Sequence, residues 1–535
     1  MLSRLVLPRA VFRTARQRSP RHAQSFWSSS KKLTKEPEQK PEQKLEQKLE
    51  QKLEQKLEQE QEQEQELELA RKQRQISAYL TGKGELVCPS CPSVICSLLD
   101  DIYMSSSRDH NAALIVATPA FAPSLQMTQD AIRCASLLSE KQNVNRFHLL
   151  LAVVDNVMTP PCTPESVSGI SIVRGRLDDL LPDLWAQPSP LAMEDTDAVS
   201  ALTLNLGGPD MTLPLARMPV NGKSSLLKAV EVDLSKPVAT VVRSLEKTSS
   251  RVTLELKRAA ASMQDYHFWI PLVPMTKPRP VTGVMGNIVR DVDIDGRVEP
   301  ASQELEGVVH DMLKHASRPA PVAIWALLTR PEHEAQKTAP EPDLSRLTRP
   351  QASEVRQWST YIAQALCWGG RLHRVLSGGG GWGPKRGLLA LDGQVTHFTS
   401  RQLDDLDQLY SAMQGSSLAP PGWHIQFFML APGVHETRAP NTAMEFGLGT
   451  SREAAFGADM GVGHRHEGTR GIIKLAGFFG AKSTQGIYVA GGTGKDGIER
   501  SDVKLSAPAS CIRVDRSKTK KPGGWLEQVV VEMAE

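Results

Sequence analysis

A glycine-rich segment between residues 377 and 392 carries the residue types that form an anion-binding loop. Four consecutive glycines follow Ser377, and two cations and a tryptophan come soon after them. Glycine loses more backbone freedom on folding than any other residue, so such a run requires a tight path or a close backbone approach. Backbone N–H groups in such loops bind anions. The candidate ligand-binding residues are Gly378, Gly379, Gly380, Gly381, Trp382, Lys385 and Arg386.

The same segment also suits a glycine-rich hairpin or bulge that only turns the chain, and the sequence leaves both interpretations open. A P-loop is not expected, because Pro384 separates Gly383 from Lys385. A later glycine-rich stretch fails the same test, since Lys495 is followed by Asp496. The dinucleotide fingerprint also fails, because no βαβ unit with an acidic partner surrounds the glycines. The sequence therefore gives no support for hydrolysis of a nucleoside triphosphate.

Two further groups of residues resemble metal or redox motifs. Cys88 and Cys91 lie near Cys96, but a structural zinc site needs four ligands and no second Cys or His pair stands nearby. His464 and His466 would share a metal only on a strand, where alternate residues face one side, and their glycine-rich surroundings favour a loop. No metal site is predicted. Catalytic residues and cofactors stay unassigned, and no G-x-S-x-G elbow is present.

The glycine segment lies between predicted elements of clear amphipathic or apolar character. Residues 354–367 have helical apolar spacing, 371–376 suit a short strand, and 388–391 form an apolar return. A helix over 402–413 and a strand over 424–430 follow. These elements predict a C-terminal α/β domain over residues 351–535, built around the glycine-rich loop.

The first half of the chain alternates helices with short apolar strands. Helices are predicted over 92–104 and 128–140, and buried strands over 112–117, 147–154 and 168–173. This alternation is typical of an α/β fold.

The middle of the chain has a different pattern. Alternating residues over 201–206 and 252–256 predict antiparallel strands with one solvated face, followed by a helix over 301–315 and a buried strand over 320–328. The expected fold is α/β, α+β in the middle, with mixed sheets flanked by helices. We expect an α/β domain over 76–329 and a Pro-rich linker or loop over 330–350.

The N-terminal region is expected to lie outside this fold. Residues 1–30 contain six arginines and no acidic residue, which is typical of a mitochondrial transit peptide. Residues 31–75 repeat Leu-Glu-Gln-Lys with a period of four, which does not match the 3.5-residue coiled-coil repeat. The repeat predicts a low-complexity tether that is disordered or partly helical.

Charge and composition exclude several classes of protein. Removing residues 1–30 changes the net charge from +3 to −3, which argues against nucleic acid as a partner. The apolar runs fall short of the roughly 20 residues of a membrane helix, so we expect a soluble chain with no integral membrane span. Seven cysteines suit a reducing compartment better than a disulfide framework.

Several stretches together resemble a known family. They are the apolar stretches 113–119, 149–154 and 168–173, the segments 286–290 and 300–306, and the glycine segment 376–392. Over about residues 85–515 the chain resembles fungal mitochondrial proteins with a FIST-type sensory domain. By this resemblance we expect residues 76–329 to form a FIST-like α/β domain. The resemblance implies an α/β domain that binds small molecules such as amino acids, and it implies no catalytic residues.

Three functions follow as hypotheses. The first is a protein of the mitochondrial matrix that binds a small anionic or zwitterionic ligand, with backbone amides from 378–383, charge from Lys385 and Arg386, and an apolar wall from Trp382. The second is a non-catalytic interaction or assembly factor with a mitochondrial protein partner. The third is an enzyme that uses the same loop.

Overall fold

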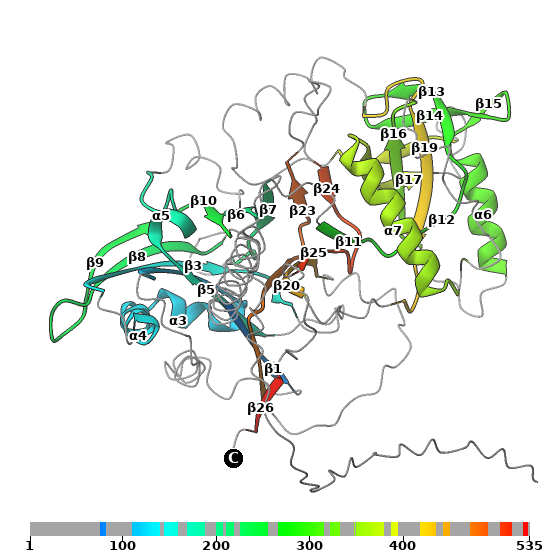
Figure 1. Cartoon of the computed structure of the whole chain (residues 1–535). Coiled ribbons are helices and arrows are strands. Elements are labelled where there is room, and N and C mark those ends of the chain that lie inside the picture. Colours follow the sequence, from blue (N-terminus) through cyan, green and yellow to red (C-terminus); the bar gives the residue numbers. More distant parts are fainter. Residues whose placement is uncertain are drawn as a thin grey trace, which may run out of the picture. The chain divides into compact units, whose positions relative to one another are not determined.

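The computed structural model describes residues 75–81, 110–139, 144–158, 168–187, 199–206, 210–218, 225–254, 266–314, 322–331, 347, 349–378, 387–393, 418–434, 442–449, 471–490, 503–515 and 528–532. All of them lie in one compact unit, Glu66–Glu535. Mixed sheets with a few flanking helices make up this unit (Figure 1), so the predicted fold class is confirmed, although strands prevail over helices.

The first sheet has eight strands, of which only one neighbouring pair is parallel. Its order is β26 (Gln528–Glu532), β21 (Gly471–Ala476), β1 (Gln75–Thr81), β5 (Gly169–Gly175), β2 (Ala112–Ala117), β3 (Arg146–Val153), β8 (Leu227–Asp233) and β9 (Thr240–Glu246). The parallel pair is β2 and β3, and every residue of β2 is buried. The strands predicted over 112–117, 147–154 and 168–173 are therefore confirmed as β2, β3 and β5.

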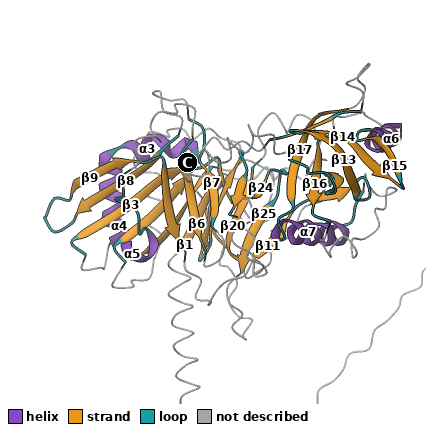
Figure 2. Ribbon diagram, turned by 90° about the horizontal axis from the view of Figure 1, so that it is seen from above, coloured by secondary structure: helices purple, strands orange, loops and turns teal. Residues whose placement is uncertain are grey.

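Helices cover one face of this sheet, as Figure 2 shows. They are α3 (Ala122–Gln126) and α4 (Thr128–Ser139), preceded by the short 3-10 helix η1 (Pro119–Phe121). Cys134, Ala135 and Leu138 of α4 pack in one apolar cluster with residues of the strands, including Ile115. The helix predicted over 128–140 is thus confirmed, because its apolar residues recur at helical spacing.

Two five-stranded sheets follow. One has the order β10 (Ser249–Thr253), β6 (Ala201–Asn205), β7 (Met211–Pro214), β23 (Ile487–Val489) and β24 (Val503–Leu505). The other has the order β11 (Tyr266–Trp269), β25 (Cys511–Asp515), β20 (Thr442–Leu448), β22 (Phe479–Ser483) and β4 (Asn156–Val157).

The sequence predicts antiparallel strands over 201–206 and 252–256. This prediction is wrong for the way these two strands pair with each other, because β10 lies parallel to β6. Parallel neighbours need a long crossover connection. Here the connection passes through β8 and β9 of the first sheet. The sequence pattern shows the alternation of side chains but carries no information about this detour.

The fourth sheet closes on itself. Its path is β12 (Leu272–Pro274), β19 (His424–Leu430), β13 (Arg279–Met285), β14 (Ile288–Ile294), β18 (Leu389–Leu391), β17 (Arg371–Gly378) and β16 (Ile324–Thr329), with β15 (Arg297–Pro300) paired to β14. Because β19 also pairs with β16, the six strands from β19 to β16 form a closed antiparallel ring. We call these six strands the ring.

Side chains of the ring alternate between its inside and its outside, as in any closed sheet. Val281, Ala326, Leu328, Leu391 and Ile425, one or two from each of four strands, share one apolar cluster, which marks the inward face. Their neighbours in sequence, such as Leu327 and Leu372, belong to a different cluster.

Two helices lie next to the strands of the ring (Figure 1). They are α6 (Gln303–Lys314) and α7 (Ala352–Cys367). The first turn of α7 carries a capping box, in which the Gln351 N–H donates to Glu354 Oε2 over 3.0 Å. Ile362 and Ala365 of α7 are fully buried with Leu372 in the cluster outside the ring. Helices predicted over 301–315 and 354–367 are confirmed.

All four sheets contain strands from both sides of the Pro-rich segment 330–350. Strands from the range 76–329 pair with strands from 351–535 in every one, for example β1 with β21 and β7 with β23. The two expected ranges are therefore interleaved within the described sheets.

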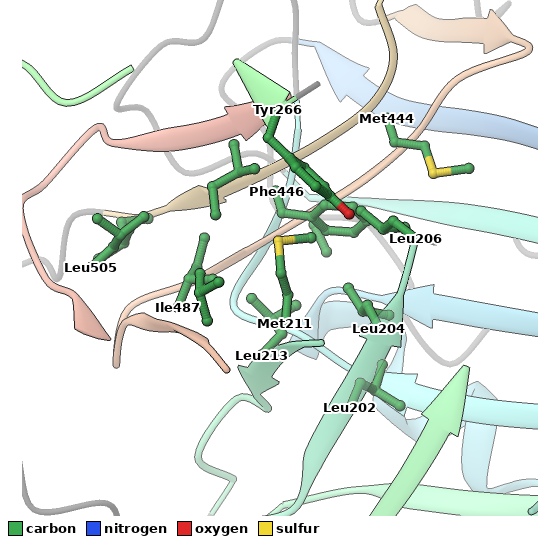
Figure 3. Packing of buried hydrophobic residues seen from close by; sticks show 14 of the residues in the cluster. Leu202, Leu204, Leu206, Met211, Leu213, Tyr266, Met444, Phe446, Ile487 and Leu505 are labelled. Carbon is green, nitrogen blue, oxygen red and sulfur yellow. The ribbon is translucent and has the colours of Figure 1, made fainter. Parts of the chain in front are cut away.

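The largest apolar cluster joins several sheets. The side chains labelled in Figure 3 come from the neighbourhoods of β6, β7, β11, β20, β23 and β24 and gather in one place; among them Leu204, Met211 and Phe446 are at most 2% exposed. This core depends on residues from both halves of the chain.

Several predictions lie outside the described residues: the helices over 92–104 and 402–413, the transit peptide 1–30, and nearly all of the tether 31–75, whose last residue begins β1. No helix within the part of the chain that the structure describes is both long and apolar enough to cross a membrane.

Candidate functional site

Of the seven predicted ligand-binding residues, Gly378 lies within the described part of the chain. Gly379, Gly380, Gly381, Trp382, Lys385 and Arg386 fall outside it. Gly378 ends β17 opposite Leu389 of β18. A Cβ on Gly378 would stand 2.1 Å from Leu389 Cδ2, so the absence of a side chain makes room for that leucine.

The other end of the glycine segment also needs glycine for a structural reason. Gly387 has φ +86°, and a Cβ there would be 2.4 Å from the Cβ of Pro300. Its carbonyl oxygen accepts a hydrogen bond from the Ser302 N–H over 3.2 Å, next to the start of α6. The hairpin interpretation thus explains both flanks, while ligand binding by residues 379–386 stays a prediction.

Polar side chains lie on the inward face of the ring at the start of β17. Arg371 and His373 are the Cα partners of Leu328 and Ala326, which belong to the inward cluster. Charged and polar residues inside a small closed sheet are unusual, because such interiors are filled by apolar side chains. Arg371 and His373 therefore need a reason for their position.

Two arginines converge on one tryptophan at this end of the ring. The Cζ atoms of Arg330 and Arg371 lie 5.6 and 5.7 Å from the centre of the Trp423 ring. Arg330 follows β16, Arg371 begins β17 and Trp423 precedes β19, so three adjacent strands bring them together. We call these three residues the arginine pair and its tryptophan.

Burial and mutual repulsion both act on Arg371. Loss of water contact is the larger cause that lowers the pKa of its guanidinium, and the positive charge of Arg330 lowers it further. Among the residues that the structure describes, no carboxylate forms an ion pair with Arg371. Two cations that repel each other are stabilised by an anion close to both, and the aromatic Trp423 side chain attracts each of them.

His373 lies deeper, with 1% of its surface exposed. Its Nδ1 is 2.8 Å from the backbone oxygen of Asp392. A carbonyl oxygen only accepts, so Nδ1 carries the proton and Nε2 has a free lone pair. Burial lowers the pKa of His373 to about 4, so the imidazole of His373 is neutral at pH 7. No described residue donates to the buried Nε2 atom.

Three charged groups act on His373 from nearby. The positive charges of Arg371 and Lys504 lower the pKa of His373, and the carboxylate of Asp392 raises it. Lys504, on β24, has its Nζ atom 5.5 Å from the centre of the Tyr488 ring. Its own pKa is lowered, mainly by burial, against the opposing effect of Asp392. Cations therefore outnumber the carboxylate around the imidazole.

Sequence reasoning missed this end of the ring. It predicted a strand over 371–376 but attached no function to Arg371 and His373, and it did not single out Arg330 or Trp423. The available signal was the alternation on that strand, where Arg371, His373 and Val375 share a face. The site depends on three strands distant in sequence, which a single-strand pattern cannot show.

The arginine pair and the glycine segment mark opposite ends of one strand. β17 begins at Arg371 and ends at Gly378, which places these residues about 23 Å apart at the rise of a strand. Gly378 therefore lies away from the arginine pair, and we treat the two as separate candidate sites.

Metal and thiol chemistry find no further support. Within the described ranges, no three His, Cys, Asp or Glu side chains come together as metal ligands. Of the described cysteines, Cys134 and Cys511 are buried and Cys367 is partly buried. Cys88, Cys91 and Cys96, and the histidines His464 and His466, lie outside the described residues.

Comparison with known proteins finds no significant match to this chain among family models, curated proteins or solved structures. The resemblance to FIST-type proteins therefore stays a prediction.

Proposed function

We propose that this chain binds a small anionic or zwitterionic ligand at the arginine pair and its tryptophan. The observation that carries the proposal is Arg371, half-buried beside a second guanidinium and without a carboxylate ion pair among the described residues. An anion would relieve the repulsion between the two cations and offset part of the burial cost. Trp423 would supply the apolar side of the site.

A thermal-shift screen of residues 66–535 against metabolite anions tests this function. Ligands that bind the native state raise the unfolding midpoint by mass action. The Arg371→Gln variant is expected to lose the shift, whereas Arg356→Gln, which changes an exposed arginine of α7, is expected to keep it.

Retention of the shift in the folded Arg371→Gln variant would contradict the proposed site. If Lys385→Ala removes the shift instead, the ligand binds at the glycine segment, as the sequence hypothesis states. A screen without any hit on well-folded protein would favour the interaction or assembly factor.

The enzyme hypothesis requires a perturbed acid or base near the ligand, and His373 meets that requirement in part. Its imidazole is neutral at pH 7 and lies two residues from Arg371 on the same face of β17. Buried histidines with lowered pKa values are also common in structural roles. Turnover of a ligand found in the screen, measured with and without His373, separates binding from catalysis.

We place this function in the mitochondrial matrix, on the basis of the arginine-rich, acid-free residues 1–30. Imaging of those residues fused to a fluorescent protein tests the localisation. A cytosolic signal would contradict it.

A further inference from the structure

We infer that the ligand of the arginine pair carries a neutral hydroxyl group, which donates to Nε2 of His373. The inference rests on the proposed function and narrows its ligand to hydroxylated anions, such as hydroxycarboxylates. Three features of the site support it. They are the lone pair of His373 Nε2 that has no donor, the spacing between His373 and Arg371, and the charges around His373.

The lone pair is the first feature. Nδ1 of His373 donates to the backbone oxygen of Asp392, so Nε2 is the remaining polar atom of the imidazole. Nε2 is fully buried, and no described residue donates to it. Ala326, which pairs with His373 across the strands, has only a methyl side chain and cannot donate. A buried acceptor without a hydrogen bond is costly, and each such atom in a native protein calls for an explanation.

The second feature is the spacing. Arg371 and His373 lie on the same inward face of β17, two residues apart, which corresponds to about 6.6 Å along a strand. One neighbour of β17 is β18, which leads to Asp392. The other neighbour of β17 is β16, and β16 leads to Arg330. A ligand of a few carbon atoms spans the distance from the guanidinium groups to this imidazole.

The third feature is charge. Arg371 and Lys504 act on His373 together with a single described carboxylate, Asp392. An ammonium donor would be repelled by this excess of positive charge. A hydroxyl group donates the same hydrogen bond without adding a cation. The site therefore favours a hydroxy anion over the zwitterion of the same shape.

Two matched sets of small molecules test the inference. Lactate, propionate and alanine share one carbon skeleton, and malate, succinate and aspartate share another; in each set only a hydroxyl, hydrogen or ammonium group differs. We expect the hydroxyl member to bind residues 66–535 at least about tenfold more tightly than its deoxy member in calorimetric titrations. The ammonium member should be the weakest.

Variants assign the preference to a residue. His373→Phe, which removes the acceptor, should reduce the hydroxyl-to-deoxy ratio to about one, whereas His373→Gln, which keeps an acceptor oxygen, should retain part of it. Circular dichroism checks that each variant is folded, and the Gln variant keeps the test decisive if the Phe variant unfolds. Arg371→Gln should weaken every member of both sets by a similar factor.

Equal binding of hydroxyl and deoxy members would overturn the inference and leave the proposed function standing. A preference that survives in His373→Phe would do the same, because the hydroxyl group would then bind somewhere other than Nε2. Tightest binding of an ammonium member would contradict the charge argument. Absence of binding by all six compounds, together with an empty thermal-shift screen, would overturn the proposed function and the inference together.

Discussion

At the scale of single residues, the informative positions are polar groups where the pattern of a closed sheet calls for apolar ones. His373 is the clearest example. It is held in one tautomer by a backbone carbonyl, its other nitrogen is buried, and loss of hydration keeps the imidazole neutral. This arrangement has a thermodynamic signature that can be measured without any ligand.

The free energy of unfolding should fall as the pH drops from about 6.5 to about 4. The pKa of His373 is about 4 in the folded chain and near its ordinary value of 6.5 when unfolded. The unfolded chain therefore binds more protons in this window, and protonation favours unfolding. A lowering of this size corresponds to about 3 kcal/mol. Urea denaturation at a series of pH values measures the effect.

The control for this prediction is a comparison of two histidine variants. His373→Gln should lose about 3 kcal/mol less than the natural chain between pH 7 and pH 4. His310→Gln, at an exposed position of α6, should follow the natural profile. Parallel profiles for the natural chain and His373→Gln would show that the imidazole is not held neutral.

At the scale of elements, local pattern and long-range pairing differ in how far the sequence predicts them. The apolar spacing of Val355, Trp358, Ile362 and Leu366 fixes α7 because 3.6-residue periodicity places them on one face. The strand over 424–430 is confirmed as β19. Its pairing with both β13 and β16, which closes the ring, depends on contacts between distant segments and leaves no mark in any one of them.

A hydrogen-bonded anchor holds α7 to the strand region before β12. Ser359 is fully buried; its hydroxyl donates to the Ile270 carbonyl over 2.8 Å and accepts from the Ile270 N–H over 3.0 Å. Ser359→Ala leaves that buried N–H without its partner, so we expect a loss of about 1–3 kcal/mol in the free energy of unfolding. Chemical denaturation measures the loss.

Ser353→Ala provides the matched control, because Ser353 lies exposed on the same helix. It should change the free energy of unfolding by less than about 0.5 kcal/mol. Equal effects of the two substitutions would mean that the buried anchor does not stabilise α7.

At the scale of the whole molecule, the sequence shows the elements on either side of the Pro-rich segment but not their interleaving. Each described sheet combines strands from 76–329 with strands from 351–535. Composition predicts a boundary at 330–350 because prolines and charges gather there. The pairing of strands across that segment appears only in the folded chain, because no local sequence pattern shows which two strands will pair.

We therefore expect residues 76–329 to fail to fold when produced alone. The fragment lacks β21, β23 and β25, so β1, β7 and β11 would expose unpaired edges. Near-ultraviolet circular dichroism and thermal melting of the fragment and of residues 66–535 provide the measurement. A cooperative melting transition in the fragment alone would show that the range is an independent domain.

The pairing of β1 with β21 also governs the order in which this chain can fold. Ile76 is the Cα partner of Ala476, roughly 400 residues further along the chain. A ribosome must have reached β21 before the second edge of β1 finds its neighbour. Until then that strand presents its free edge to other chains, as slow, long-range sheet formation generally does. Of the described strands, β1 is therefore made first and is among the last to be fully paired.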